Sequence, residues 1–314
     1  MEFLNVSRND ILVSVKPSYL DKKIFEDLIL PFVALTIDVS IITLTVFKEP
    51  FKSAIGVKNV VILQCLGGLG YTTFKLCNYI SAIIWIKYKV RFTIVISTFY
   101  IQLNYFLYNV NFTVPSIITY WRFMLIVYQR ETSAFENIAL AIFSLLFNFI
   151  CLIHTTLYAT NLSQSSLFTK FFTYGPMLED YMAWFDIAPQ VISGIIAFFM
   201  NIGILVKIRI ETIKTVARSK SYSNEVTLTI NLLFHTIMPL FFIFYANIYY
   251  NILINAGIES PIAAKIYHFL ELSYLIISPL SLVLFIKSYR NYFFSSFYKM
   301  NTIFVSSVTG RIIL

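Results

Sequence analysis

Few side chains in this 314-residue sequence have the types and spacing that covalent or metal chemistry requires. Its three histidines lie far apart, and its three cysteines all lie in apolar stretches: His154, His235, His268, Cys65, Cys77 and Cys151. Neither set has the short spacing of metal ligands, and no H-E-x-x-H, G-x-S-x-G or Walker segment occurs. The residues therefore predict no enzyme, no metal site and no cofactor, and the cysteines are expected to be small core residues.

Charged residues inside apolar stretches are the more informative set. Among them are Asp38, Arg122, Asp186 and Glu271. A charge near the middle of a bilayer costs about 2.5–3.5 kcal/mol on insertion scales, so such groups normally face the interior of a helix bundle and find a partner there. Each could serve function, or could simply bond a neighbouring helix or, for the arginine, anchor a helix end.

Three prolines, Pro189, Pro239 and Pro279, also lie inside long apolar stretches. A proline removes a backbone hydrogen bond and breaks a helix in water. In a membrane helix, neighbouring helices or trapped water satisfy the freed carbonyl, and the kink is tolerated. The three positions therefore predict three kinked membrane helices.

The composition requires a bilayer around these elements. Hydrophobic residues make up 58% of the chain and charged residues 13%, whereas a soluble domain has about 25% charged residues. A helix needs about 20 mostly apolar residues to cross the hydrocarbon, and the chain has room for seven such spans. We expect an all-α membrane protein with spans at 24–47, 59–84, 92–127, 138–158, 182–206, 226–252 and 262–286.

The ends of the chain are expected to flank one transmembrane domain, residues 24–287. Residues 1–23 lack the apolar run of a cleavable signal peptide and predict an extracellular segment. Residues 288–299 (SYRNYFFSSFYK) alternate charge and aromatics, which predicts a short amphipathic helix on the membrane surface within a cytoplasmic tail, 288–314. The net charge of +8 favours contact with anionic lipid, and no basic helix or aromatic platform predicts a nucleic-acid partner.

Charge and glycosylation sequons favour an N-terminus outside the cell. In the second half of the chain, basic residues gather in the loops that would then be cytoplasmic. Two N-x-S/T sequons, at Asn5 and Asn161, would lie outside and could be glycosylated. A third, at Asn111, lies inside the third span and should be inaccessible.

Several segments then resemble one family. Residues 120–128 (YWRFMLIVY) resemble a D/E-R-Y/F segment with its trailing Val-Tyr, with Arg122 at the invariant arginine. Residues 234–242 (FHTIMPLFF) are similar to F-x-x-C-W-x-P, and residues 278–282 (SPLSL) are similar to N-P-x-x-Y. In this order they resemble the rhodopsin-like G-protein-coupled receptors. The many Phe, Tyr and Ile residues, and EPFKSAIG at 49–56, resemble the nematode serpentine chemoreceptors, the Srx class most.

Two departures from that family pattern matter. Trp121 replaces the acid that would form a local ion pair with Arg122, so a resting state must be held in another way. The usual disulfide between the third span and the second outer loop has no cysteines to form it.

The resemblance implies a chemosensory receptor in the plasma membrane, such as that of a sensory cilium, which binds an external small molecule such as an odorant and activates a heterotrimeric G protein. It implies a switch and coupling surface, helix hinges, a polar network and a ligand pocket. The implied switch and coupling surface consists of Arg122, Phe123, Tyr128, Lys214, Arg218 and Lys220. The implied helix hinges are Pro189, Pro239 and Pro279, and the implied polar network contains Asp38 and Ser278. The implied ligand pocket consists of Asn104, Tyr105, Tyr108, Phe241, Phe244, His268 and Glu271.

Alternatives remain open at this point. Each pocket aromatic could instead pack against lipid or core, and the basic loop could serve only to orient the chain. A small transporter would predict inverted repeats or broken helices in matching positions, and neither is visible in the sequence. A seven-spanning chemosensory channel of the insect type would place the N-terminus inside the cell.

Overall fold

Long helices make up nearly all of the computed structural model. It describes the backbone of residues 11–48, 55–165, 167–174, 176–214, 220–247, 261–286 and 289–292. Side chains are described over the same ranges except near some helix ends, chiefly 176–187, 212–224 and 242–272. In chain order the helices are α1 (Ser18–Lys23), η2 (Ile24–Ile29, a π-helix), α2 (Leu30–Phe47), α3 (Ile55–Lys87), α4 (Ile94–Val127), α5 (Ala134–Tyr158), α6 (Pro176–Lys214), α7 (Lys220–Asn247) and α8 (Pro261–Phe285).

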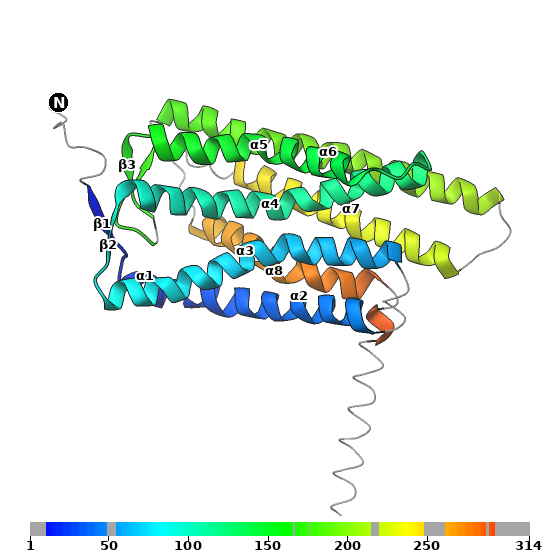
Figure 1. Ribbon diagram of the computed structural model, residues 1–314, viewed down its shortest axis with the longest axis horizontal. Coiled ribbons are helices and arrows are strands. Elements are labelled where there is room, and N and C mark those ends of the chain that lie inside the picture. Colours follow the sequence, from blue (N-terminus) through cyan, green and yellow to red (C-terminus); the bar gives the residue numbers. More distant parts are fainter. Residues whose placement is uncertain are drawn as a thin grey trace, which may run out of the picture.

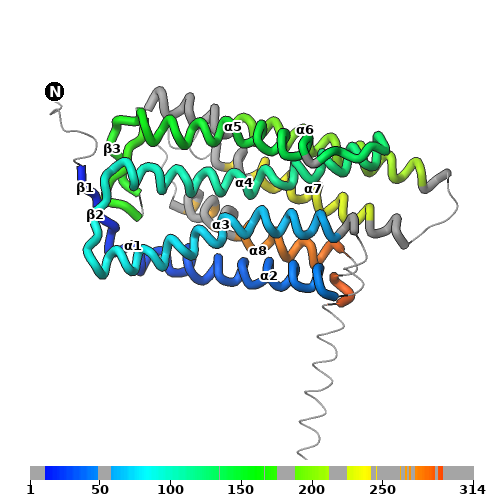
Figure 2. The backbone as a smooth tube through the Cα atoms, viewed as in Figure 1, coloured from blue at the N-terminus to red at the C-terminus, as the bar shows by residue number. Residues whose placement is uncertain are grey.

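The helices α2 to α8 run along the long axis of one bundle (Figure 1). Helices α2 and α8, the first and last of the long helices, lie side by side (Figure 2). Five helical segments of the described chain are long and apolar enough to cross a membrane: Ser18–Phe47, Lys58–Lys87, Ile94–Val127, Phe135–Tyr158 and Ala188–Glu211. Helices α7 and α8 contribute shorter apolar segments, Glu225–Phe241 and Ser273–Phe285.

Each expected span overlaps a long helix, but α6 and α7 differ clearly in length from the prediction. Helix α6 begins at Pro176 rather than at 182, and α7 begins at Lys220 rather than at 226. Helix α6 continues to Lys214, whereas the sequence predicted that the fifth span would end at 206. The expected basic connection therefore begins as helix. Its Lys207 forms an ion pair with Glu211 one turn later, at 3.3 Å, and such i,i+4 pairs favour helix over loop.

Among the helix starts whose caps are described, only that of α5 has a side-chain cap. Helix α5 begins with a capping box, in which the Ser133 hydroxyl accepts from the Glu136 backbone and the Glu136 carboxylate accepts from the Ser133 backbone. Within the helices, hydroxyls such as those of Thr113 and Thr119 donate to the carbonyl four residues earlier. Such bonds leave no polar hydrogen facing lipid.

One end of the bundle carries four short strands that the all-α prediction lacked. Strand β1 (Leu12–Ser14) pairs antiparallel with β2 (Arg91–Thr93), and β3 (Asn161–Ser163) pairs antiparallel with β4 (Phe171–Thr173). An isolated bridge between Val15 and Phe168 joins the two pairs. We call this end of the bundle the strand end. Three-residue strands are too short to leave an alternating pattern in a sequence.

The predicted C-terminal surface helix is described for one turn only. Residues 289–292 are helical, and the rest of the segment lies outside the described residues. Tyr289 is buried, and its hydroxyl lies 2.5 Å from the Thr45 hydroxyl at the end of α2. The chain after α8 therefore turns back onto the bundle at the end opposite the strands.

Candidate functional site

Arg122 lies buried at the end of α4 that is opposite the strands, and its guanidinium bonds to α7. Only 3% of the side chain is exposed. Nη2 donates to the Glu225 carboxylate at 2.5 Å, and Nη1 donates to the Thr229 hydroxyl at 3.0 Å. Glu225 and Thr229 lie one turn apart on α7, so both face α4 at once. A buried guanidinium needs a carboxylate and further hydrogen bonds to be stable, and α7 supplies both.

This contact explains how Arg122 is held although Trp121 replaces the acid next to it. The sequence predicted that Arg122 would lack a partner on its own helix and must be held in another way. The partner is Glu225, an interhelical carboxylate that sequence reasoning missed. Its position one turn before Thr229, at the start of an apolar run, was the available signal.

The other predicted coupling residues surround Arg122 less closely. The Phe123 ring packs against Gly203 of α6, with ring carbon Cε2 3.0 Å from the place where a Cβ on that glycine would be. Tyr128 is 65% exposed, and its ring contacts that of Phe123 edge to face. Lys214 is the last residue of α6, and Lys220 is the first residue of α7. The side chains of both lysines lie outside the described part of the chain, as does all of Arg218.

A second polar group lies between α7 and α8, fully enclosed. The Ser281 hydroxyl accepts from Asn231 at 2.8 Å and lies 2.7 Å from Nε2 of His235. Nδ1 of His235 lies 3.2 Å from the Tyr274 hydroxyl. Predicted Ser278 takes part through its backbone carbonyl, to which Ser281 donates at 2.7 Å. Sequence reasoning missed His235 and Asn231, although they lie four residues apart on one face of the sixth span.

Two of the predicted hinge prolines flank this polar group. Pro189, Pro239 and Pro279 lie inside α6, α7 and α8 as predicted, and Pro115 lies inside α4. Because a proline cannot donate to the carbonyl four residues earlier, Pro239 frees the carbonyl of His235. The weakened turn of α7 thus coincides with its buried histidine.

Asp38 lies in a different polar group from Ser278, although the sequence predicted one network. The Asp38 carboxylate is buried on α2 and bonds the Cys65 thiol on α3. Oδ2 of Asp38 and Oδ1 of Asn111 lie 3.3 and 3.8 Å from the place where a Cβ on Gly68 would be. The glycine therefore leaves room for two polar side chains from α2 and α4. Among the described contacts, Asp38 and Ser278 share no partner.

The sequence lacks the cysteines for a disulfide between the third span and the second outer loop. At the strand end, hydrogen bonds join these two segments instead. The Ser97 hydroxyl at the start of α4 donates to the Lys170 carbonyl at 3.1 Å. The Phe172 backbone N–H donates to the Thr98 hydroxyl at 2.9 Å. These bonds join α4 to the hairpin β3–β4. None of the three cysteines, which lie in helices α3 and α5, forms a disulfide.

An aromatic cluster seals the same end. Phe168 is 1% exposed, and its ring contacts those of Trp85, Phe92 and Tyr100 at centroid distances of 5.9–6.2 Å. The segment before α2 closes over it, since Tyr19 is buried and donates to Asp27 at 2.6 Å. Asp27 in turn lies 3.0 Å from the Lys75 ammonium of α3. Residues 11–29 are thus folded against the bundle.

The seven predicted pocket residues divide into three groups. Tyr108 packs in the interior, with ring centroids 4.5 Å from Phe112 and 5.4 Å from Tyr71. Asn104 is half-buried, and Tyr105 and Phe241 are 53% and 52% exposed. The remaining three have helical backbones, but their side chains lie outside the described part: Phe244, His268 and Glu271. Asp186 has the same status.

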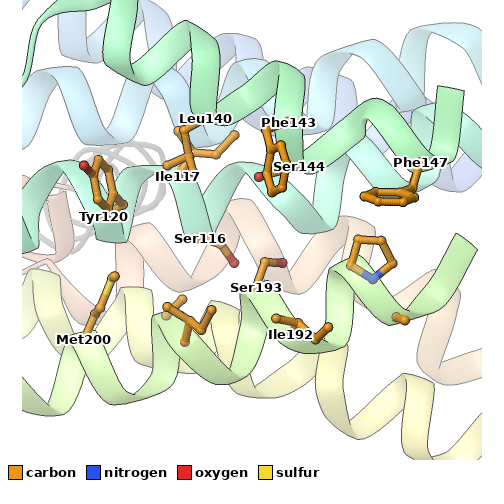
Figure 3. A pocket seen from close by; sticks show the side chains of 14 residues that line it. Ser116, Ile117, Tyr120, Leu140, Phe143, Ser144, Phe147, Ile192, Ser193 and Met200 are labelled. Atoms are coloured by element: carbon orange, nitrogen blue, oxygen red, sulfur yellow. The ribbon is translucent and has the colours of Figure 1, made fainter. Parts of the chain in front are cut away.

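A cavity lies between α4, α5 and α6, and none of those seven residues lines it. Its volume is about 380 Å³, and its walls include Ser116, Ser144, Ser193 and the predicted hinge Pro189. Figure 3 shows these walls, with the Ser116 and Ser193 hydroxyls directed toward the space between α4 and α6. No pattern in the sequence predicted this cavity, because it depends on how three helices pack against one another.

Two of the three sequons lie within the described residues. Asn161 is exposed at the start of β3, as glycosylation requires. Asn111 is 5% exposed inside α4, in agreement with its expected inaccessibility. Asn5 lies outside the described residues.

A comparison with solved structures shows which known fold the helices resemble. The chain matches the crystal structure of squid rhodopsin with a TM-score of 0.61 over 96% of this chain and 84% of that one. The chain has a rhodopsin-like fold. Sequence identity is 14%, so the match concerns the arrangement of helices and not the ligand. No family model and no curated protein matches the sequence.

Proposed function

We propose that this chain is a seven-spanning, rhodopsin-like receptor that couples an external small molecule to a heterotrimeric G protein, and that it is not an enzyme. The observation that carries the proposal is the buried contact of Arg122 with Glu225 and Thr229, set within a fold similar to that of squid rhodopsin. A charged joint between α4 and α7, buried near one end of the bundle, is a natural place for a two-state switch.

The described contacts support a resting state for that switch. While Glu225 holds Arg122, the ends of α4 and α7 stay together. Separation requires α7 to swing at Pro239, whose turn lacks one backbone hydrogen bond. A ligand that binds the separated state more tightly shifts the population toward it. The released guanidinium, with Phe123, Tyr128 and the basic residues Lys214, Arg218 and Lys220, then meets the G protein.

The orientation and location follow from the same hypothesis. The strand end, with Asn161, faces the outside, as does the sequon at Asn5 in the sequence-based topology, and α7 and α8 both span the plasma membrane. The ligand enters between the helices near Asn104, Tyr108, His268 and Glu271. The sequence resemblance to nematode serpentine chemoreceptors favours a chemical cue such as an odorant as the ligand, and a sensory cilium as the location.

The first experiment measures G-protein nucleotide exchange stimulated by the chain in cell membranes without added ligand, normalised to surface expression. We expect Glu225→Gln to raise basal exchange several-fold, because the amide removes the charge that holds Arg122. Arg122→Ala should lower exchange to the background of untransfected membranes. Glu211→Gln is the matched control, since its carboxylate pairs with Lys207 on the same helix and is about half exposed. Equal exchange by all four proteins would contradict the switch.

A second experiment tests orientation independently. An epitope tag at the N-terminus should bind antibody on intact cells, and a C-terminal tag should bind only after permeabilisation. The reverse pattern would favour a chemosensory channel with its N-terminus inside and would rule out the receptor.

A further inference from the structure

The cavity between α4, α5 and α6 has an apolar wall with a few hydroxyls and no charged residue. It extends along α6 from Ala188 to Met200, a rise of about 18 Å at 1.5 Å per residue. Its volume of about 380 Å³ lies within the range of small-molecule sites, about 300–1,000 Å³. The cavity thus has the length and volume of a rigid molecule of about four fused rings with a short tail.

The cavity opens toward the membrane side of the bundle. Ile192 and Phe143 line it and are 57% and 66% exposed. They belong to segments of α6 and α5 that are long and apolar enough to cross a bilayer. A molecule dissolved in the hydrocarbon therefore reaches the cavity without passing through water, and a charged one is excluded by the cost of desolvation.

Two serine hydroxyls in the wall are unused by the described structure. Hydroxyls elsewhere in these helices donate to the carbonyl four residues back, as Thr113 and Thr119 do on α4. Ser116 and Ser144 line the cavity and have no hydrogen-bond partner among the described residues. Ser193, across the cavity, donates to the Gln190 carbonyl at 3.0 Å and keeps its acceptor lone pairs. An apolar wall with unpaired hydroxyls fits a ligand with one hydroxyl.

We propose that this cavity is a site for a membrane sterol, an uncharged lipid with a rigid apolar body and a single hydroxyl. The sterol enters from the bilayer, and its hydroxyl bonds with Ser116 and Ser144 while its rings lie along α6. A phospholipid headgroup is too polar for this wall, and a plain acyl chain leaves the serines unpaired.

The site also adjoins the switch, and this part rests on the proposed function. Tyr120 lines the cavity two residues before Arg122, and Pro189 lines it at the weakened turn of α6. Next to the cavity, Asn201 of α6 donates to Thr119 of α4 at 3.3 Å. A bound sterol spans the same two helices, so it stabilises whichever spacing of α4 and α6 it fits.

The test is photolabelling of the full-length chain in phospholipid nanodiscs with a photoreactive, hydroxyl-bearing sterol. We expect labelled peptides from α4, α5 or α6, and at least fivefold less labelling in the presence of excess unlabelled sterol. Ser193→Phe, which fills the cavity, should reduce labelling about tenfold. Ile195→Phe is the matched control, because Ile195 is on the same helix, is 44% exposed and does not line the cavity. Its labelling should equal that of the unmodified chain.

A second, less disruptive variant distinguishes loss of the sterol site from misfolding of the chain. Ser116→Ala with Ser144→Ala removes two hydroxyls without adding bulk, and should weaken sterol labelling severalfold while leaving the thermal denaturation midpoint unchanged. Labelling elsewhere on the chain, labelling indifferent to Ser193→Phe, or competition by a fatty acid equal to that by sterol would overturn the proposal. Since labelling needs no G protein, failure here is separate from failure of the receptor function.

Discussion

The environment of Arg122 shows how one residue connects two helices that lie far apart in the sequence. The neighbouring Trp121 removes the possibility of a local ion pair, and the structure supplies the carboxylate of Glu225 from another helix. An ion pair within one helix restrains only a side chain, whereas an ion pair between helices restrains the distance between them. In this chain the charge that stabilises Arg122 therefore also holds α4 against α7.

The buried group around Ser281 leads to a prediction about stability. Ser281→Ala leaves Asn231 and His235 without their shared partner, and an unsatisfied buried polar group costs about 1–3 kcal/mol. We expect the thermal denaturation midpoint of the purified protein to fall by several degrees. Ser40→Ala is the matched control, because its exposed hydroxyl bonds only the Thr36 carbonyl of its own helix. If the two variants unfold at the same temperature, the α7–α8 group contributes nothing to stability.

At the scale of the element, the glycines of α3 show which helix faces meet. Gly67 faces Val114 of α4, where an added Cβ would lie 3.1 Å from three side-chain atoms, and Gly68 leaves room for Asp38 and Asn111. Gly70 has nothing within 4 Å. A small residue allows a neighbouring helix to approach closely, and the structure shows such an approach at Gly67 and Gly68 but not at Gly70. A sequence places a small residue on a helix but does not say which way it faces.

These glycines allow a controlled comparison on one helix. Alanine is a better helix former than glycine by about 1 kcal/mol, so Gly70→Ala should raise the denaturation midpoint. Gly67→Ala gains the same propensity but must displace Val114, whose branched side chain has few rotamers, so we expect a lower midpoint. Thermal unfolding of both variants in the same detergent measures the difference. A Gly67→Ala protein as stable as Gly70→Ala would mean that α3 and α4 are not held at this distance.

At the scale of the whole molecule, packing rather than a disulfide holds the strand end together. The hairpin β3–β4, the N-terminal segment and the start of α4 meet around Phe168, and backbone and hydroxyl hydrogen bonds fix their register. The order of this end therefore depends on buried side chains and not on a disulfide. The chain is therefore expected to keep its fold under reducing conditions.

A core substitution at this end tests that view. Phe168→Ala removes a buried ring, which typically costs about 3–5 kcal/mol. We expect a lower denaturation midpoint and faster protease cleavage between residues 159 and 174. Leu162→Ala in the same hairpin is the control, because that side chain is 52% exposed and should change neither quantity. Slow cleavage in the Phe168→Ala protein would show that other contacts order the loop.

The sequence by itself determined the solvent and the order of the helices, because apolar runs of membrane length and prolines within them are local properties. It also singled out Arg122, Asp38 and the prolines Pro189, Pro239 and Pro279, since charges and prolines are rare in such runs. Only the tertiary structure decided that Glu225 holds Arg122, that His235 and Ser281 meet, and that a cavity opens beside Pro189. Those facts depend on which faces of distant helices come together. The period of one helix can show that a face is buried, but it does not show which other helix that face meets.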